Sequence, residues 1–168
     1  PPATIPSSKA ARVAAIESLG RMGSVQAYIP ILKRAYDSSP AVKIAALAAL
    51  ARIKPQESTG YLESALKDPL PEVRITAIET LTKYKSDKTL ILKSASDLLR
   101  DKNPAVCAAA VQCLRELREK DSVKTLAERL PDASWRLRYD IITGLKDLTG
   151  MEFGFDAKAW TNWYLANK

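Results

Sequence analysis

The most informative absence in this 168-residue chain is that of histidine, which does not occur at all. Histidine is the commonest general base in enzymes, and it is also the commonest metal ligand. Its absence argues against most hydrolase and metalloenzyme chemistry. We therefore predict that the chain is not an enzyme and that it has no catalytic residue, no metal site and no cofactor.

Cysteine is nearly absent too, since Cys107 and Cys113 are the only two. On a helix, a separation of six residues places two side chains about 240° apart around the axis and roughly 9 Å apart along it. Such a pair cannot form a disulfide without breaking the helix. Two thiols without histidine also cannot close a zinc site. The sequence predicts neither a disulfide framework nor a set of metal ligands.

Long apolar runs are missing as well. No stretch approaches 18 consecutive apolar residues, so we expect no membrane span and no signal sequence. No segment alternates between apolar and polar residues as a half-buried strand does. The chain begins at Pro1 rather than at methionine, so we expect a processed or trimmed chain. The compartment stays open between the cytoplasm and export after removal of a leader.

What the sequence does contain is an internal repeat. Pro40, Pro71 and Pro104 each open a similar apolar run, at spacings of 31 and 33 residues, and Lys9 and Trp135 occupy the same position in one copy before and one copy after. We call these five positions the origins. Aliphatic residues recur two, seven and ten places after the origins, and a small residue recurs six places after in four copies. These positions share one face of a helix, so each copy predicts a helix.

A second helical segment follows in each of the first four copies, with aliphatic residues at helical spacing in residues 24–36, 56–67, 87–100 and 121–130. Pairs of helices that recur at this period predict an all-α fold, a right-handed α-solenoid of about five stacked helix pairs. The expected boundaries are an extended proline-rich leader at 1–8, repeats at 9–39, 40–70, 71–103, 104–134 and 135–149, and a C-terminal segment at 150–168.

Charged residues follow the same period. An aspartate stands three places before four of the origins, at Asp37, Asp68, Asp101 and Asp132. A basic residue stands three places after four origins, at Arg12, Lys43, Arg74 and Arg138, and Cys107 takes this place in the fourth copy. We call these residues the aspartate ladder. Each aspartate is expected to cap the following helix and to pair with basic residues of its own and the adjacent repeat. The predicted role is structural.

These residues together resemble a known family. The third copy has the pattern of aspartate, proline, a valine–arginine pair, alanine and leucine, at Asp68, Pro71, Val73, Arg74, Ala77 and Leu81. Over roughly residues 8–149 the chain resembles HEAT-repeat proteins of the short bacterial type, which also occur among phycobilisome-lyase-like proteins. The resemblance implies an all-α repeat fold and a binding role, and it does not name the partner. Lyase-type chromophore attachment and a chaperone role remain remote alternatives.

The C-terminus has a different composition from the repeats. Five of the eleven aromatic residues lie in the last sixteen positions: Phe153, Phe155, Trp160, Trp163 and Tyr164. Asp156 can start a helix on which the last three of these share one face. We predict that residues 150–168 form an aromatic capping helix over the open end of the last repeat. An aromatic docking site for a partner is the alternative.

Positions on the opposite face of the predicted helices are expected to line the concave surface, which is the usual binding surface of a solenoid. The predicted partner-binding residues, which we call the concave stripe, are Glu17, Arg21, Arg52, Glu79, Lys83, Gln112, Glu116, Asp140 and Asp147. Its charge changes from basic at Arg21, Arg52 and Lys83 to acidic at Glu116 and Asp147. The first interpretation of these charges is a solvated rim, and the alternative is an oriented groove for a peptide or a protein.

The net charge leaves two functional hypotheses. The chain has 26 lysine and arginine residues against 19 aspartate and glutamate residues, which gives a formal charge of +7. Such an excess favours anionic partners, but it is spread over both halves of the chain and forms no basic arm. We therefore expect a non-catalytic scaffold that binds another protein through the concave or edge surface. Nucleic-acid binding is the second hypothesis.

Overall fold

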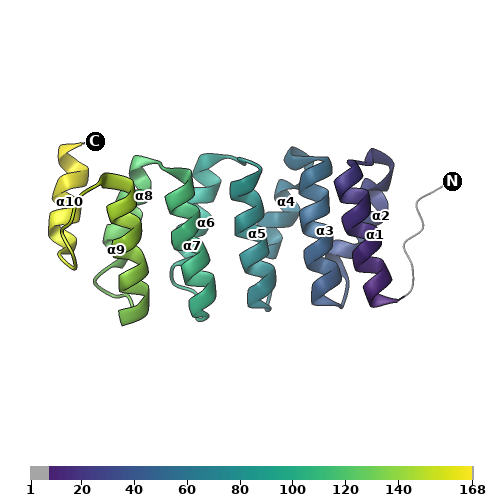
Figure 1. Cartoon of the computed structure of the whole chain (residues 1–168), viewed down its shortest axis with the longest axis horizontal. Helices are drawn as coiled ribbons and strands as arrows, with labels where there is room; N and C mark the ends of the chain where they lie inside the picture. The colour runs from purple at the N-terminus through teal and green to yellow at the C-terminus, as the bar shows by residue number, and fades with distance from the viewer. Residues whose placement is uncertain (1–7, 168) are drawn as a thin grey trace. The chain divides into compact units, whose positions relative to one another are not determined.

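The computed structural model of the chain describes residues 8–167, and this part contains ten α-helices, two 3-10 helices and no strand (Figure 1). The all-α prediction is therefore confirmed, and the helices are arranged as a helical-repeat solenoid. Residues 1–7 of the expected leader lie outside the described residues. The chain divides into two compact units, residues 1–86 and 87–168.

In unit 1 the helices are α1 (Lys9–Met22), α2 (Tyr28–Leu32), α3 (Pro40–Ile53), α4 (Pro55–Ala65) and α5 (Pro71–Lys83), with 3-10 helices η1 (Val25–Ala27) and η2 (Lys33–Tyr36) on either side of α2. Helix α3 packs between α1 and α5, and α4 packs against both α3 and α5. Three of these helices begin at the origins of the sequence repeat. Proline suits that place because the first N–H groups of a helix have no partner within it.

The core of unit 1 forms where α3 meets its neighbours. Leu47 and Leu50 are buried on α3, as the periodicity predicts. On the α1 side the two backbones approach so closely that a methyl group at Gly20 would lie 2.8 Å from the Cβ of Ala49. Carbon atoms do not tolerate such a distance, so glycine is required there. Small residues thus set the spacing between neighbouring helices of the repeat.

In unit 1, the prediction of one continuous second helix in the first repeat is wrong. The segment 24–36 is expected to be a single helix, but it is divided into η1, α2 and η2. The cause is Pro30, which has no N–H for a helical hydrogen bond and disfavours helical geometry in the residue before it. A new helix begins at Tyr28, which places Pro30 in a first turn where its missing N–H is not needed.

In unit 2 the helices are α6 (Lys88–Leu98), α7 (Pro104–Leu117), α8 (Lys120–Arg129), α9 (Trp135–Thr149) and α10 (Ala157–Ala166). Helix α7 packs against α6 and α9, and α8 packs against both α9 and α10. Buried aliphatic residues of α7, α8 and α9, among them Leu114, Leu126 and Leu145, form the core of this unit. Helix α10 lies at the end of the chain and packs on the last complete repeat (Figure 1).

The C-terminal helix is held by buried aromatic residues. Trp160 is fully buried, its ring meets that of Phe153 edge-on at a centroid distance of 4.8 Å, and its Nε1 donates to the carbonyl of Gly154 at 2.9 Å. The buried Tyr164 donates its hydroxyl to Oδ1 of Asp121 on α8 at 2.7 Å. This bond raises the pKa of Tyr164, because a carboxylate beside the hydroxyl disfavours the phenolate. The aromatic cap is therefore anchored by packing and by hydrogen bonds.

Two of the five aromatic residues expected in the cap contribute less. Phe155 is 67% exposed, and Trp163 is only half-buried. Asp156 is the N-cap of α10, so Phe155 precedes the helix and does not share the face that carries Trp160 and Tyr164. The expectation that Phe155 packs in the cap is wrong, because its ring is exposed to solvent.

The packing predicts unequal effects of two aromatic truncations. Replacing Trp160 with alanine should lower the free energy of unfolding by about 3–5 kcal/mol, because it removes a large buried side chain and leaves a cavity. Phe155→Ala should change it by less than about 0.5 kcal/mol, because that ring is exposed. Urea denaturation followed by circular dichroism measures both values. Equal losses for the two variants would contradict the described cap.

Candidate functional site

The aspartate ladder joins consecutive repeats in unit 1. Arg12 on α1 pairs with Asp37, which precedes α3, at 3.6 Å, and Lys43 on α3 pairs with Asp68, which precedes α5, at 2.6 Å. Both carboxylates are largely shielded from solvent. Each pair therefore links a helix of one repeat to the loop that begins the next.

The aspartates do not cap the helices in the expected way. Three of them accept a hydrogen bond from the N–H two residues further on: Asp37 from Ser39 at 2.9 Å, Asp68 from Leu70 at 3.0 Å and Asp101 from Asn103 at 2.8 Å. The residues that donate these bonds are themselves the N-caps of α3, α5 and α7. The aspartates thus order the loop before each helix rather than its first turn.

In the fourth repeat, Cys107 occupies the basic position of the aspartate ladder, and the contacts at that position differ from those in unit 1. Cys107 stands 25 residues before Asp132, the separation that joins Lys43 to Asp68. Its Sγ instead donates to the backbone carbonyl of Asp101 at 3.2 Å. Asp132 is exposed and forms no ion pair with any described residue. Arg138, the basic residue expected to pair with Asp132, donates instead to the carbonyl of Pro131 at 2.7 Å.

Asp68 and Asp132 allow a matched test of the ladder. Burial alone would raise the pKa of Asp68, but hydrogen bonds from Lys43 and from the Leu70 N–H outweigh it and lower that pKa overall. Asp68→Asn keeps an acceptor for the N–H and removes the ion pair, so we expect a loss of about 1–3 kcal/mol of unfolding free energy at neutral pH. Asp132→Asn should cost less than about 0.5 kcal/mol.

The pH dependence of this difference follows from the lowered pKa. The ion pair stabilises the fold fully above the pKa of aspartate in the unfolded chain, and this contribution is lost as the pH falls through the lower pKa of folded Asp68. The gap between the wild type and Asp68→Asn should therefore shrink in acid. Urea denaturation across this pH range measures the gap. A gap that stays constant into strong acid would contradict the ion pair.

Cys107 also lines a cavity of about 230 Å³ in unit 2, together with Asp101, Arg129, Arg136 and Asp140. The thiol is 5% exposed, and burial followed by the nearby Asp101 carboxylate raises its pKa above the ordinary value. A reactive cysteine needs the opposite, a lowered pKa and an accessible sulfur. The environment of Cys107 is that of a structural thiol, and it does not favour covalent attachment of a chromophore.

We accordingly expect both cysteines to react slowly in the folded protein. Cys113 is also buried, so neither thiol offers a disulfide reagent an open path. The rate of labelling by dithiobisnitrobenzoate at mildly alkaline pH should be far below that of the urea-unfolded chain. A folded Cys113→Ser variant that labels as fast as the unfolded chain would show that the Cys107 thiol is activated.

Four of the five members of the concave stripe in unit 1 come together. Glu17, Arg21, Arg52 and Lys83, from α1, α3 and the end of α5, line one groove of about 370 Å³. We call it the unit 1 groove. Glu79 is exposed on α5 and does not line it.

The floor of the unit 1 groove is formed by small side chains of α3. Ala45 and Ala49 are buried, Ala48 is exposed, and Ile44 is half-buried beside them. Alanines leave room between α1 and α5 that larger side chains would fill. The floor is therefore apolar and offers no hydrogen-bonding side chain.

The cations at the rim differ in their partners. Arg21 lies 3.8 Å from the carboxylate of Glu17, one turn away on α1. Arg52 donates from Nε to the hydroxyl of Tyr84 at 3.4 Å, and Nζ of Lys83 lies 5.9 Å from the centroid of the Tyr84 ring. Among the described residues, neither Arg52 nor Lys83 pairs with a carboxylate. Tyr84 was not expected in this site, although it directly follows the last basic position of the stripe.

The stripe members of unit 2 are engaged locally instead. Arg115 forms an ion pair with Asp147 and donates to Oε1 of Gln112 at 3.0 Å. Gln112 in turn donates to Glu116 at 2.8 Å. Asp140 lines the cavity beside Cys107. The acidic charges expected at this end of the stripe are thus partly neutralised by neighbours in the same unit.

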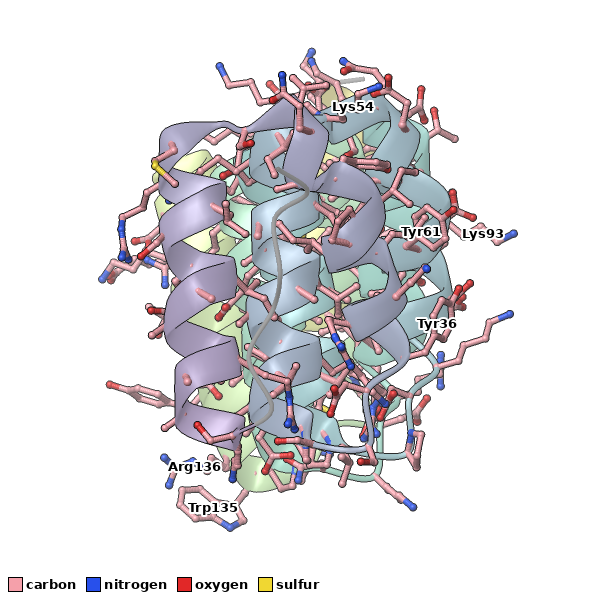
Figure 2. The ribbon with its side chains drawn as sticks, turned by 90° about the vertical axis from the view of Figure 1, so that its right-hand side faces the viewer. Tyr36, Lys54, Tyr61, Lys93, Trp135 and Arg136 are labelled. Carbon is pink, nitrogen blue, oxygen red and sulfur yellow. The ribbon has the colours of Figure 1, made fainter. Side chains whose placement is uncertain are left out.

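Unit 2 also exposes aromatic residues that lie outside the predicted concave stripe. Trp135 is 80% exposed and Tyr139, one turn further along α9, is 70% exposed. Figure 2 shows Trp135 and the adjacent Arg136 projecting away from the ribbon. The available signal was a tryptophan at an origin where three other repeats have proline.

Residues 8–167 contain no group of three or more histidine, cysteine, aspartate or glutamate side chains arranged to hold a metal ion. No helix in the same range has both the length and the hydropathy that crossing a membrane requires.

Two models of known protein families match the chain. A model of HEAT repeats matches residues 28–93, and a model of the PBS lyase HEAT-like repeat matches residues 11–38. No curated protein matches the chain. The two matches together include every residue that lines the unit 1 groove.

Proposed function

The chain is a short HEAT-repeat protein, and we propose that it is a non-catalytic scaffold that binds another protein through the unit 1 groove. HEAT repeats generally mediate interactions between proteins, so the repeat family supports a binding role. The observation that carries the proposal for this site is a groove with an apolar floor and two cations that have no carboxylate partner among the described residues.

This combination suits a protein ligand. An apolar floor surrounded by polar groups is the usual anatomy of a binding interface, in which buried apolar area supplies affinity and the rim supplies orientation. Arginine and tyrosine, present as Arg52 and Tyr84, are among the residues that contribute most to binding at such surfaces. The surrounding helices α1, α3 and α5 hold the groove in shape by their mutual packing.

Nucleic-acid binding is supported less well by the same groove. Its cations would attract phosphate, but proteins that bind single strands add aromatic surfaces on which bases stack. Tyr84 is the one aromatic residue that lines the unit 1 groove, and the floor is alanine and isoleucine. The geometry therefore favours a protein segment.

Affinity capture from a lysate of the source organism, with and without nuclease, tests the proposal. We expect a stoichiometric protein that survives nuclease treatment. The groove variant Arg21→Glu, Arg52→Glu and Lys83→Glu should lose it, because repulsion replaces attraction at the rim. The control variant Lys33→Glu, Lys67→Glu and Lys93→Glu has the same net charge, its three lysines are exposed and do not line the groove, and it should retain the partner.

Two results would contradict the proposal. One is a partner that binds the groove variant and the control variant equally well. The other is capture of nucleic acid, with partner proteins recovered only when nuclease is omitted. Circular dichroism of both variants checks that each remains helical.

A further inference from the structure

We propose that the ligand of the unit 1 groove is an acidic segment of a partner protein, whose carboxylates bind Arg52 and Lys83 while small or aliphatic side chains pack on the alanine floor. This inference rests on the proposed function and adds the chemistry of the partner. Three features of the groove support it, namely its charge balance, the arrangement of its polar atoms and its size.

The charge balance of the groove is positive. Three cations and one carboxylate line it, and that carboxylate, Glu17, lies near Arg21 alone. Arg52 and Lys83 have only the neutral Tyr84 as a polar partner among the described residues. By contrast, Lys43 in the ladder is bound to Asp68 at 2.6 Å. The groove thus retains two positive charges for which the described part of the chain supplies no counter-charge.

The polar atoms are arranged to receive a carboxylate. Arg52 uses Nε for its bond to Tyr84, so both terminal nitrogens of the guanidinium remain available for a two-pronged contact with a carboxylate. The Tyr84 oxygen accepts that bond, and its own proton is free to be donated. Tyr84 also lies under the ammonium group of Lys83. One tyrosine therefore lies beside both cations of the groove.

The size and lining of the groove restrict the rest of the ligand. A volume of about 370 Å³ holds a few small side chains. Ala48 is exposed on the floor, and Ala45 and Ala49 flank it, so the contact surface is apolar and shallow. Alanine, valine or leucine fits such a floor, and adjacent glutamate or aspartate residues would reach the cationic rim. The expected ligand is an acidic segment interrupted by small or aliphatic residues.

Selection from a random peptide display library on the immobilised full-length protein tests the inference. We expect the selected peptides to be enriched in aspartate and glutamate beside small or aliphatic residues. Fluorescence anisotropy measures the affinity. The double variant Arg52→Gln with Lys83→Gln should bind such a peptide about tenfold or more weakly, because two charge-assisted contacts are lost. The matched control, Lys33→Gln with Lys67→Gln, should leave its affinity unchanged. Glutamine in place of the peptide's own glutamates should weaken binding to a similar extent.

A steric variant separates this inference from the proposed function. Ala48→Trp fills the exposed part of the floor without entering the core, so it should block any ligand of the groove. If Ala48→Trp abolishes the binding of selected peptides that contain no acidic residues, the acidic-partner inference is wrong. The scaffold proposal then still stands. Failure to select any peptide that Ala48→Trp blocks would overturn both, as would peptides that bind the exposed Trp135 surface instead and are lost in Trp135→Ala.

A nucleic-acid control completes the design. A single-stranded oligonucleotide is titrated against the selected peptide at low and moderate salt. We expect weak competition that disappears as salt rises. An oligonucleotide that displaces the peptide at moderate salt and is itself blocked by Ala48→Trp would overturn the acidic-peptide inference in favour of phosphate recognition.

Discussion

The close packing of helices from neighbouring repeats is the constraint on which the other features of this protein depend. In unit 1, α3 packs between α1 and α5, and the contact with α1 is so close that Gly20 could not carry a side chain without a shift of the backbone. This spacing brings the ladder residues of successive repeats within ion-pairing distance. It also leaves a groove above the alanines of α3, because their short side chains do not fill the space between the two flanking helices.

The basic residues of unit 1 include two groups that composition cannot separate. In the ladder, Arg12 and Lys43 are shielded from solvent and paired with aspartates. At the groove, Arg52 and Lys83 are held by a neutral tyrosine and face a cavity. A charge that is already paired contributes to stability, whereas an unpaired charge at a rim is available to a ligand. Under the proposed function, it is the second group that would contact the partner.

Unit 2 uses the same repeat with different partners. The ladder position that is basic in unit 1 is a buried thiol at Cys107, and its hydrogen bond to a backbone carbonyl takes the place of an ion pair. On the stripe, Arg115 engages Asp147 and Gln112. The cap supplies the remaining stability through Trp160 and through the bond from Tyr164 to Asp121. The local neutralisation of its charges is the reason that the proposed binding site lies in unit 1.

The sequence by itself determined the class of fold and the places where helices begin. Both depend on local properties, namely the period of apolar residues and the position of proline in a first turn. The same periodicity also identified which side of α1, α3 and α5 carries Glu17, Arg21, Arg52 and Lys83. Its errors were local as well: Pro30 divides a predicted helix, and Phe155, which was expected to pack in the cap, precedes the helix and is exposed.

Only the tertiary structure decided which charges are paired and which are free. Asp68 meets Lys43 while Asp132 meets no basic residue in the described part of the chain, although the two aspartates occupy equivalent places in the repeat. Tyr84 enters the site because the end of α5 brings it beside Arg52, which is 32 residues earlier. Pairing depends on distances between side chains of different helices. A sequence period specifies the face of a helix, but the packing of one helix on the next sets those distances.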